Sequence, residues 1–390
     1  MLGMAERFSG EWRSVKLGDV VRGKLSYGIN AAAVPYDGKN PAYIRITDIT
    51  EYGRYNAAGK VSVIASTRER EKYRLREGDI VLARTGSVGK SYLYDPKDGE
   101  LIYAGYLIKA SINCEKCDPR YVFYQLHTRR YWSWIATMSK RSVQSGINSK
   151  EYALFTFPLP PLDEQIAIAD TLSAFDRHLA NLSELIAKHE GIRAGALEDL
   201  LSGRTRLPGF SCEWRTVKLG EVVSVKRGKR VVRRDLSVRG KFPVFQNSLK
   251  PLGYFDRNNC PPESAFLIAG GNAGDAGFCD SAFWAADDCY YFVERESVHQ
   301  KFLYYVLIRN HYYLHTQARR TTIPRLSHDI IESITIPLPP VDEQIAIAET
   351  LSALDLNITN LKAEHAKISS LRTAAINDLL TAKIRLPRPH

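Results

Sequence analysis

The 390-residue sequence lacks long hydrophobic runs and contains only six cysteines. No stretch reaches the roughly 18 apolar residues that a membrane helix needs. Residues 1–10 show no apolar segment of the kind found in secretory signals. Six cysteines in a chain of this length do not make a disulfide framework. We therefore expect a cytoplasmic protein with reduced thiols and no membrane partner.

Metal-binding and catalytic patterns are also scarce. Cys114 and Cys117 form the one close cysteine pair, and a structural zinc site usually needs a second pair. No methyltransferase or nuclease motif is apparent in the sequence. We expect no metal site, no cofactor and no catalytic residue, and hence a protein that is not an enzyme.

Positive charge is abundant. The formal net charge is +11, and apolar residues make up 44% of the chain, enough for sizeable cores. A soluble protein this basic favours a polyanionic partner, and nucleic acid is the most common one.

The most informative feature is an internal repeat, which is sought before other patterns. Three segments occur twice: FSGEWRSVKLGDVV at 8–21 and FSCEWRTVKLGEVV at 210–223, PLPPLDEQIAIA at 158–169 and PLPPVDEQIAIA at 337–348, and RLP at 206–208 and 385–387. We call these copied segments the frame. Matches of this length indicate a duplication.

The stretches between the frame segments have diverged. The offset between copies falls from 202 residues at the first segment to 179 at the second, so the second intervening stretch is 23 residues shorter. Residues 22–157 and 224–336 have also lost most of their similarity. We call these stretches the first and second inserts. A frame that stays alike while its inserts differ indicates one scaffold that carries two different binding domains.

Each copy of the frame predicts a long helix. The PLPP segment is a rigid lead-in, because proline disfavours helix at and before its position. Asp163 and Glu164 then lie where acidic groups stabilise a helix start. Gly203 and Pro208 are stop signals. Each predicted helix covers about 40 residues, or roughly 60 Å at 1.5 Å per residue.

Apolar residues spaced by three and four along both helices predict a coiled-coil seam. A helix of this length cannot bury its seam alone, so we expect the two to pack antiparallel against each other. The predicted seam contains Leu172, Phe175, Leu179, Leu182 and Ile186, extended by Ile192, Leu197 and Leu200, and in the second copy Leu351, Leu354, Ile358, Leu361 and Ile368, extended by Leu371, Ile376 and Leu379.

Both inserts indicate mixed α/β structure. Residues 43–49 alternate like a strand, and residues 73–90 predict a strand between two turns, the second of them glycine-rich. Residues 266–274 repeat the device of a strand followed by a glycine loop. Residues 121–134 and 302–313 have aromatic side chains at helical spacing.

Polar and basic residues are concentrated in the predicted loops. Arg, Lys, Gln and Asn suit base edges, whereas Lys, Arg, Ser, Thr and glycine-loop amides suit phosphates. The candidate DNA-contacting residues are Arg45, Arg84, Thr85, Ser87, Lys90, Arg141, Ser142, Gln144, Ser145 and Asn148 in the first insert, and Arg227, Lys229, Arg230, Arg233, Arg234, Asn247, Asn272, Arg319, Arg320, Thr321, Thr322 and Arg325 in the second.

The frame motifs together with EGDIVLARTGSVGK at 77–90 resemble the specificity subunits of Type I restriction–modification systems, over nearly the whole chain. The resemblance implies an α+β fold in which two mixed α/β target-recognition domains are separated and joined by two long helices. The helices would form an antiparallel coiled coil with a pseudo-two-fold internal repeat. The implied parts are recognition domain 1 at 1–157, the first long helix at 158–207, recognition domain 2 at 208–336 and the second long helix at 337–390.

The resemblance also implies a function. Each recognition domain would read one half of an asymmetric, bipartite site in double-stranded DNA, and the coiled coil would set the spacing between the half-sites. The subunit itself would not be a catalyst. It would recruit two methyltransferase subunits and, through them, motor–nuclease subunits.

Three alternatives remain open from the sequence. Gly89-Lys90-Ser91 ends like a phosphate-binding loop, which would suit a nucleotide-binding enzyme, but Arg84 stands where the first glycine is needed. A stand-alone DNA-binding regulator shares the charge and the inserts but has no need of two long helices with copied starts. The third alternative is the specificity component of a related system with fused methylation and cleavage.

Overall fold

The computed structural model describes residues 11–139, 146–237, 240–295, 298–318 and 325–387. The chain divides into two compact units. The first unit contains residues 1–182 and 364–390, and the second contains residues 183–363. Each unit therefore combines one insert with the beginning of one long helix and the end of the other, a grouping that cuts across the predicted domain list.

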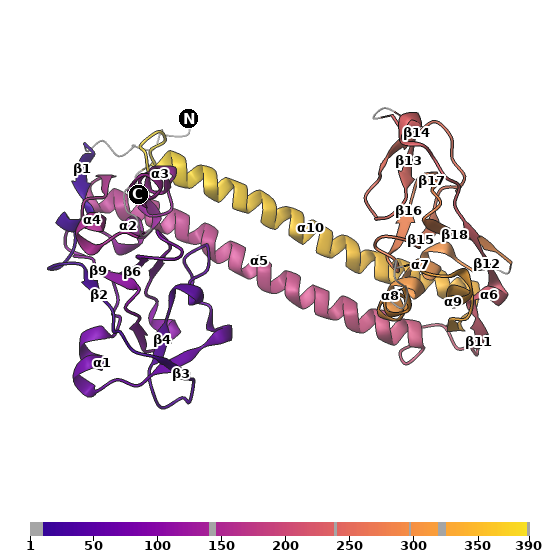
Figure 1. Cartoon of the computed structure of the whole chain (residues 1–390), viewed down its shortest axis with the longest axis horizontal. Helices are drawn as coiled ribbons and strands as arrows, with labels where there is room; N and C mark the ends of the chain where they lie inside the picture. The colour runs from indigo at the N-terminus through magenta and orange to yellow at the C-terminus, as the bar shows by residue number, and fades with distance from the viewer. Residues whose placement is uncertain (1–10, 140–145, 238–239, 296–297, 319–324, 388–390) are drawn as a thin grey trace, which may run out of the picture. The chain divides into compact units, whose positions relative to one another are not determined.

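The first unit, drawn mainly in indigo to magenta in Figure 1, is built on three small sheets. Their strand orders are β1-β10, β2-β9-β6-β7 and β3-β5-β4-β8. All five residues of β6 are buried, which explains why this strand is an unbroken apolar run after its first residue. Its strands and helices are β1 (Arg13–Lys16), β2 (Ser26–Tyr27), β3 (Ala33–Pro35), β4 (Ala42–Ile44), β5 (Val61–Val63), α1 (Thr67–Tyr73), β6 (Asp79–Ala83), β7 (Ser91–Leu93), β8 (Leu101–Tyr103), β9 (Leu107–Ser111), α2 (Pro119–Gln125), α3 (Arg129–Ser139), α4 (Ser149–Ala153), β10 (Thr156–Leu159) and the start of α5 (Leu162–Ser202).

The second unit has sheets of order β11-β19, β12-β18-β15-β16 and β14-β13-β17. Here β15 is the strand with all residues buried. Its strands and helices are β11 (Arg215–Lys218), α6 (Leu219–Val222), β12 (Val223–Arg227), β13 (Phe242–Phe245), β14 (Gly253–Phe255), β15 (Ser264–Ile268), β16 (Ala276–Cys279), β17 (Trp284–Ala285), β18 (Cys289–Glu294), α7 (Gln300–Arg309), α8 (His311–Ala318), α9 (His328–Glu332), β19 (Thr335–Leu338) and the start of α10 (Val341–Leu379).

Several local predictions differ from the structure. The strand predicted at 43–49 ends at Ile44, and a 3-10 turn follows at Ile46–Asp48. Each predicted aromatic helix is divided in two, as α2 with α3 and as α7 with α8. The strands predicted at 73–90 and 266–269 are present as β6 and β15. Helix α5 ends one residue before Gly203, whose φ of +73° is the left-handed conformation that stops a helix.

A buried ion pair joins the start of α5 to the segment after α10 within the first unit. The side chain of Glu164 is fully buried. Its carboxylate accepts hydrogen bonds from Trp12 Nε1 at 3.1 Å and from Arg385 Nε and Nη2 at 2.9 and 2.6 Å. We call this group the first clamp. The sequence suggested that Glu164 is a helix-start charge, but its burial shows that it is chiefly a structural ion-pair partner.

The second unit contains the same arrangement. Glu343 accepts hydrogen bonds from Trp214 Nε1 at 2.9 Å and from Arg206 Nε and Nη2 at 2.6 and 2.7 Å. We call this group the second clamp. The tail of one copy of the frame therefore binds the helix start of the other copy, which explains why the RLP segment was retained in both.

A second pair of contacts joins the long helices inside each unit. In the first unit, Asp176 on α5 pairs with Arg372 on α10 and accepts a hydrogen bond from Tyr124. In the second unit, Arg193 on α5 pairs with Asp355 on α10 at 2.9 Å.

These arginines lie next to two predicted seam residues. Ile192 and Leu371 are each 47% exposed, so the extension of the seam through them is wrong. The neighbouring arginine occupies the inward-facing place because a carboxylate on the other helix is there to neutralise it. The seam residues Leu172, Leu182, Leu351 and Ile358 are buried, and Phe175, Leu179, Ile186, Leu354, Leu361 and Ile368 are half-buried.

Candidate nucleic-acid interface

Three loops meet in the first unit. The backbone N–H of Ile147, just before α4, donates to the carbonyl of Arg84 in the glycine loop at 2.9 Å. The N–H of Ser149 donates to the Tyr27 hydroxyl at 3.1 Å, and the guanidinium of Arg84 lies 4.9 Å from the centre of the Tyr27 ring. The glycine loop, the end of β2 and the start of α4 thus form one surface, which also holds Asn148.

The second unit brings the corresponding loops together. The N–H of Leu326 donates to the carbonyl of Ala269 at 2.8 Å, and Gly270 forms a backbone bridge with Arg325. The N–H of Asn272 in the glycine loop donates to the carbonyl of Asn247 at 3.1 Å. The two predicted features, a glycine loop and the end of the closing segment, therefore lie together in both units.

A glycine after the first strand of each insert has the same role in both units. A Cβ on Gly28 would lie 2.2 Å from the carbonyl oxygen of Tyr103, and one on Gly228 would lie 2.1 Å from that of Ala286. Only glycine allows the backbones to approach this closely. Equivalent backbone contacts thus survive in inserts whose side chains have diverged.

Tyrosine hydroxyls hold the glycine loop of the first unit. The Tyr152 hydroxyl donates to the carbonyl of Ala83 at 2.7 Å and accepts from the N–H of Gly89 at 3.1 Å. The Tyr131 hydroxyl donates to the carbonyl of Gly89 at 2.9 Å. Burial raises the pKa of Tyr152 above its ordinary value, so the hydroxyl stays neutral at physiological pH. In the second unit, His315 Nδ1 lies 3.2 Å from the carbonyl of Ala273.

The predicted cations differ in their availability. Lys229, Arg230, Arg233 and Arg234 are exposed on the segment between β12 and β13. Arg227 is exposed but donates from Nε to the carbonyl of Asp287 at 2.7 Å.

Some predicted residues are engaged by the protein itself. The guanidinium of Arg45 binds both oxygens of Asp48, at 2.8 and 2.9 Å. Lys90 is half-buried, and its Nζ lies 3.4 Å from the carbonyl of Ile49. Arg325 pairs with Asp288 at 3.0 Å.

The remaining predicted residues are polar and loop-borne. Thr85 is half-buried, whereas Ser87, Asn247 and Asn272 are exposed. The predicted residues that lie outside the described part of the chain are Arg141, Ser142, Gln144, Ser145, Arg319, Arg320, Thr321 and Thr322.

Sequence reasoning missed two tyrosines of this surface. Tyr27 packs against Arg84, and Tyr106 is 62% exposed beside it, with its carbonyl accepting from the N–H of Arg84 at 3.0 Å. Single tyrosines in diverged inserts carry no pattern that could have identified them.

The described residues contain no group of three or more His, Cys, Asp or Glu side chains that could hold a metal ion. Cys114 is exposed and Cys117 is buried, and both are free thiols. Among the helices of the described ranges, none combines the length and the apolar character needed to cross a membrane.

The chain is similar in sequence to proteins of a known family. The sequence profile of the family described as "Type I restriction modification DNA specificity domain" matches residues 9–188 and 212–370. The MjaVIII specificity subunit of Methanocaldococcus jannaschii is 25% identical over 96% of this chain and 93% of its own length. The EcoDI specificity subunit of Escherichia coli is 27% identical over 44% of this chain and 40% of its own length.

The fold has a close counterpart among solved structures. The S subunit of a Type I restriction–modification system from M. genitalium superposes with a TM-score of 0.68 at 18% sequence identity, covering 97% of this chain and 99% of that chain. The chain shares with that structure a mixed α/β fold, and each of its two units brings a glycine loop against a closing segment. The chain belongs to the family of Type I restriction–modification DNA specificity domains.

Proposed function

We propose that the chain is the non-catalytic DNA-reading subunit of a Type I restriction–modification complex, in which each unit reads one half of an asymmetric bipartite site. The observation that carries this proposal is the repeated meeting of a glycine loop with the closing segment. The first unit places Arg84 and Asn148 there, with the Asn148 side-chain oxygen capping α4, whereas the second places Asn272 there together with Arg325, which pairs with Asp288. Similar scaffolds with different side chains suit two half-sites of different sequence.

The two long helices serve as an antiparallel coiled coil that sets the distance between half-sites. The matched contacts of Arg372 with Asp176 and of Arg193 with Asp355 support this role, because they fix the two helices to each other within each unit. An internal repeat of this kind suits half-sites that are read in opposite orientations. Half-sites about one helical turn apart, roughly 35 Å, would suit such an arrangement.

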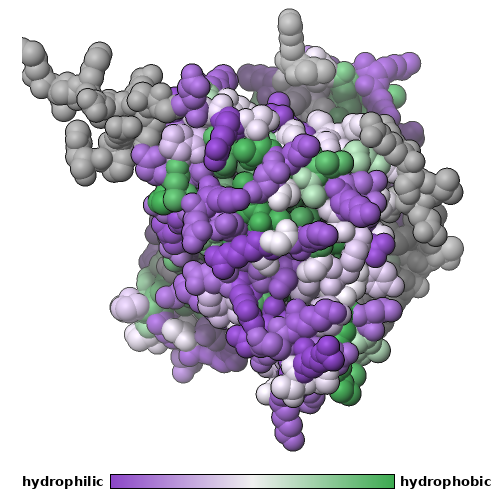
Figure 2. All heavy atoms as spheres, turned by 90° about the vertical axis from the view of Figure 1, so that its left-hand side faces the viewer, coloured by the Kyte–Doolittle hydropathy of each residue, from purple (hydrophilic) through white to green (hydrophobic). Residues whose placement is uncertain are grey.

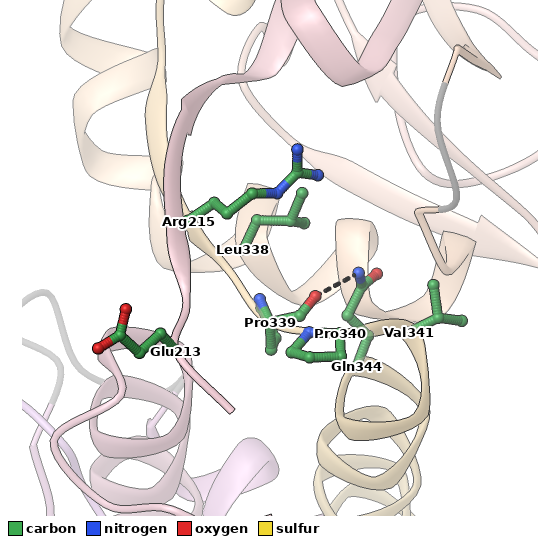
Figure 3. A pocket seen from close by; sticks show the side chains of 7 residues that line it. All are labelled: Glu213, Arg215, Leu338, Pro339, Pro340, Val341 and Gln344. Atoms are coloured by element: carbon green, nitrogen blue, oxygen red, sulfur yellow. Dashed lines mark hydrogen bonds between the residues drawn. The ribbon is translucent and has the colours of Figure 1, made fainter. Parts of the chain in front are cut away.

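The frame also supplies a surface for partner subunits. A pocket in the second unit is lined by Glu213, Arg215, Pro340, Val341 and Gln344, with Leu338 and Pro339 (Figure 3). Gln344 Nε2 donates to the carbonyl of Pro339 at 2.9 Å and so shapes the floor (Figure 3). Every lining residue has an identical counterpart in the first copy, except that Leu162 corresponds to Val341.

Copied residues that remain exposed are best explained by binding. Pro161 and Asp163 are exposed, and Leu162 and Ile166 are 37% and 39% exposed, although burial would favour both of these apolar side chains. The face of the first unit seen in Figure 2 is largely hydrophilic, with hydrophobic side chains gathered in small areas. A surface that both units share suits two copies of one partner, the methyltransferase subunit, which would in turn bring the motor–nuclease subunits.

Co-expression with the methyltransferase subunit from the same operon tests this function. The expected result is a stable complex that binds DNA more tightly than the chain alone. Leu162→Asp and Val341→Asp should each remove one methyltransferase subunit, and the double variant should remove both. Leu154→Asp is the matched control, because Leu154 is 54% exposed in the first unit but its counterpart in the second copy is Ser333. Failure to recruit the methyltransferase, together with no gain in DNA affinity, would refute the proposal.

A further inference from the structure

A second pocket, of about 650 Å³, lies in the first unit between α10 and the α2–α3 segment. Its lining includes Tyr52, Arg129, Trp132, Arg372 and Asn377. This volume is within the range of pockets that hold small molecules. None of these residues belongs to the loops of the candidate nucleic-acid interface or to the copied surface of the frame.

In the second unit, an ion pair between side chains occupies the region that corresponds to this pocket. Arg309, at the end of α7, binds both oxygens of Glu198 on α5 at 2.9 Å and donates to the carbonyl of Leu201 at 3.1 Å. By the 179-residue offset of the frame, Glu198 corresponds to Asn377.

The counterpart of Arg309 follows from a shared contact. Tyr305 binds Ser352 and Asp355 in the second unit just as Tyr124 binds Ser173 and Asp176 in the first. Four residues beyond these tyrosines stand Arg309 and Thr128. The first unit thus lacks both members of the Arg309–Glu198 ion pair and has Thr128 and Asn377 in their places.

The pocket is lined by an arginine whose hydrogen bonding is incomplete. Arg372 is 6% exposed, and its Nε pairs with Asp176. Its Nη2 group is buried and finds no hydrogen-bond partner among the described residues. Leaving a buried, charged donor without an acceptor carries a desolvation cost. An oxygen atom of a ligand would remove that cost.

The charges near the pocket favour an anion. Arg129, Arg372 and Glu51 line the pocket, and Arg54 and Arg372 both pair with Asp176, so these three guanidinium groups exceed the two carboxylates by one charge. Arg129 is exposed at the rim and can turn toward a ligand.

The pocket also offers flat apolar surface and a neutral acceptor. Trp132 is 42% exposed and Tyr52 is 57% exposed. The centre of the Tyr52 ring lies 5.9 Å from the Arg372 guanidinium. Because the Tyr52 side chain is exposed, the ring can rotate away and give a ligand access to Arg372. His127 Nδ1 donates to the carbonyl of Phe123 at 2.8 Å, and burial lowers the pKa of His127 to about 4. At neutral pH its Nε2 is therefore an acceptor.

We propose that this pocket binds a small phosphate ester with a flat ring, a nucleotide-type ligand. Arg372 and Arg129 bind the phosphate oxygens, while the ring stacks on Trp132 and Tyr52, as bases stack on aromatic side chains in single-strand binding proteins. His127 Nε2 accepts a hydrogen bond from the ligand. Asn377 lies at the place where the second unit has a carboxylate.

Titration of the full-length chain with adenosine 5′-monophosphate tests the proposal, with calorimetry and tryptophan fluorescence as readouts. We expect the nucleotide to bind at least tenfold more tightly than either adenosine or inorganic phosphate. Binding should quench tryptophan fluorescence, and this quenching should be absent in Trp132→Phe. Asn377→Glu should weaken binding at least tenfold, because it places a carboxylate beside the two arginines. Asn377→Gln, whose side chain has the shape of the glutamate but carries no charge, should stay within threefold of the native chain.

Thermal unfolding of both Asn377 variants shows that the fold is retained. Three outcomes would overturn the proposal: no binding at millimolar nucleotide, equal affinity for inorganic phosphate and nucleotide, or equal weakening by the Glu and Gln variants. Binding of a partner polypeptide that Asn377→Glu abolishes, without any nucleotide binding, would assign the pocket to a protein contact instead. The test does not involve DNA, so it is independent of the proposed function.

Discussion

The first clamp predicts a large and specific effect of Glu164→Gln. The substitution keeps the shape of the side chain but replaces one carboxylate oxygen with an NH₂ group. Glu164 accepts three hydrogen bonds from Trp12 and Arg385, and it is fully buried. In the variant an amide N–H faces these donors, and the guanidinium loses its counter-charge.

The expected magnitude follows from the burial of the pair. Breaking a buried ion pair by removing one partner costs about 3–5 kcal/mol. Arg385 is 24% exposed and keeps some solvation, so we expect the lower end, about 3 kcal/mol. For domains of 150–250 residues, a loss of 1 kcal/mol lowers the Tm by about 2–4 °C. The Tm of the first unit should therefore fall by roughly 6–12 °C.

Differential scanning calorimetry of the whole chain measures this shift. Asp163→Asn is the control, because Asp163 is the exposed neighbour on the same helix turn and should change the free energy of unfolding by no more than about 0.5 kcal/mol. Glu343→Gln should affect the transition of the second unit instead. If Glu164→Gln and Asp163→Asn shift the Tm equally, the clamp does not stabilise the unit and the reasoning is wrong.

Four further results are expected. Asn272→Ala should weaken binding to the second half-site only, by about 1–3 kcal/mol. Quantitative footprinting measures this loss, and an equal loss of protection at both half-sites would count against the prediction. Lys229→Ala and Arg230→Ala should each lower the slope of log affinity against log salt by about 0.9 without changing sequence preference; an unchanged slope would mean that neither touches phosphate. Gly228→Ala should distort the reading loops of the second unit, because its Cβ would lie 2.1 Å from a carbonyl oxygen, whereas wild-type behaviour would disprove the close approach. Four residues added to both long helices should lengthen the spacer between the half-sites by about 6 Å, roughly two base pairs, and leave each half-site unchanged. An unchanged spacer length would show that the helices do not set the distance between the half-sites.

The sequence could predict the long helices and where they begin and end, because the copied prolines and acidic residues, and Gly203 after the first helix, act locally. It could not predict that Glu164 binds Arg385, since that contact depends on the chain returning more than 200 residues later. The same limitation caused the error at Ile192 and Leu371. Apolar spacing predicted them to be buried, but a carboxylate on the opposing helix draws the adjacent arginine inward instead.

The candidate interface shows the same division. The glycine loops and the ends of the closing segments were predictable, because glycine and polar residues mark them in the sequence. The engagement of Arg45 by Asp48 was not, because a strand prediction over 43–49 hides the 3-10 turn that brings them together. Tyr27 and Tyr106 were missed for a related reason: they acquire a role only when the loops fold against each other.

Genome-wide mapping of methylated adenines in the host tests the central claim most directly. We predict that deleting the gene abolishes methylation at one asymmetric bipartite motif. Replacing residues 22–156 with the first insert of another family member should then change one half of that motif and preserve the other half and the spacer. A change in both halves, or an unaltered methylation pattern after deletion, would contradict the account that each unit reads one half-site.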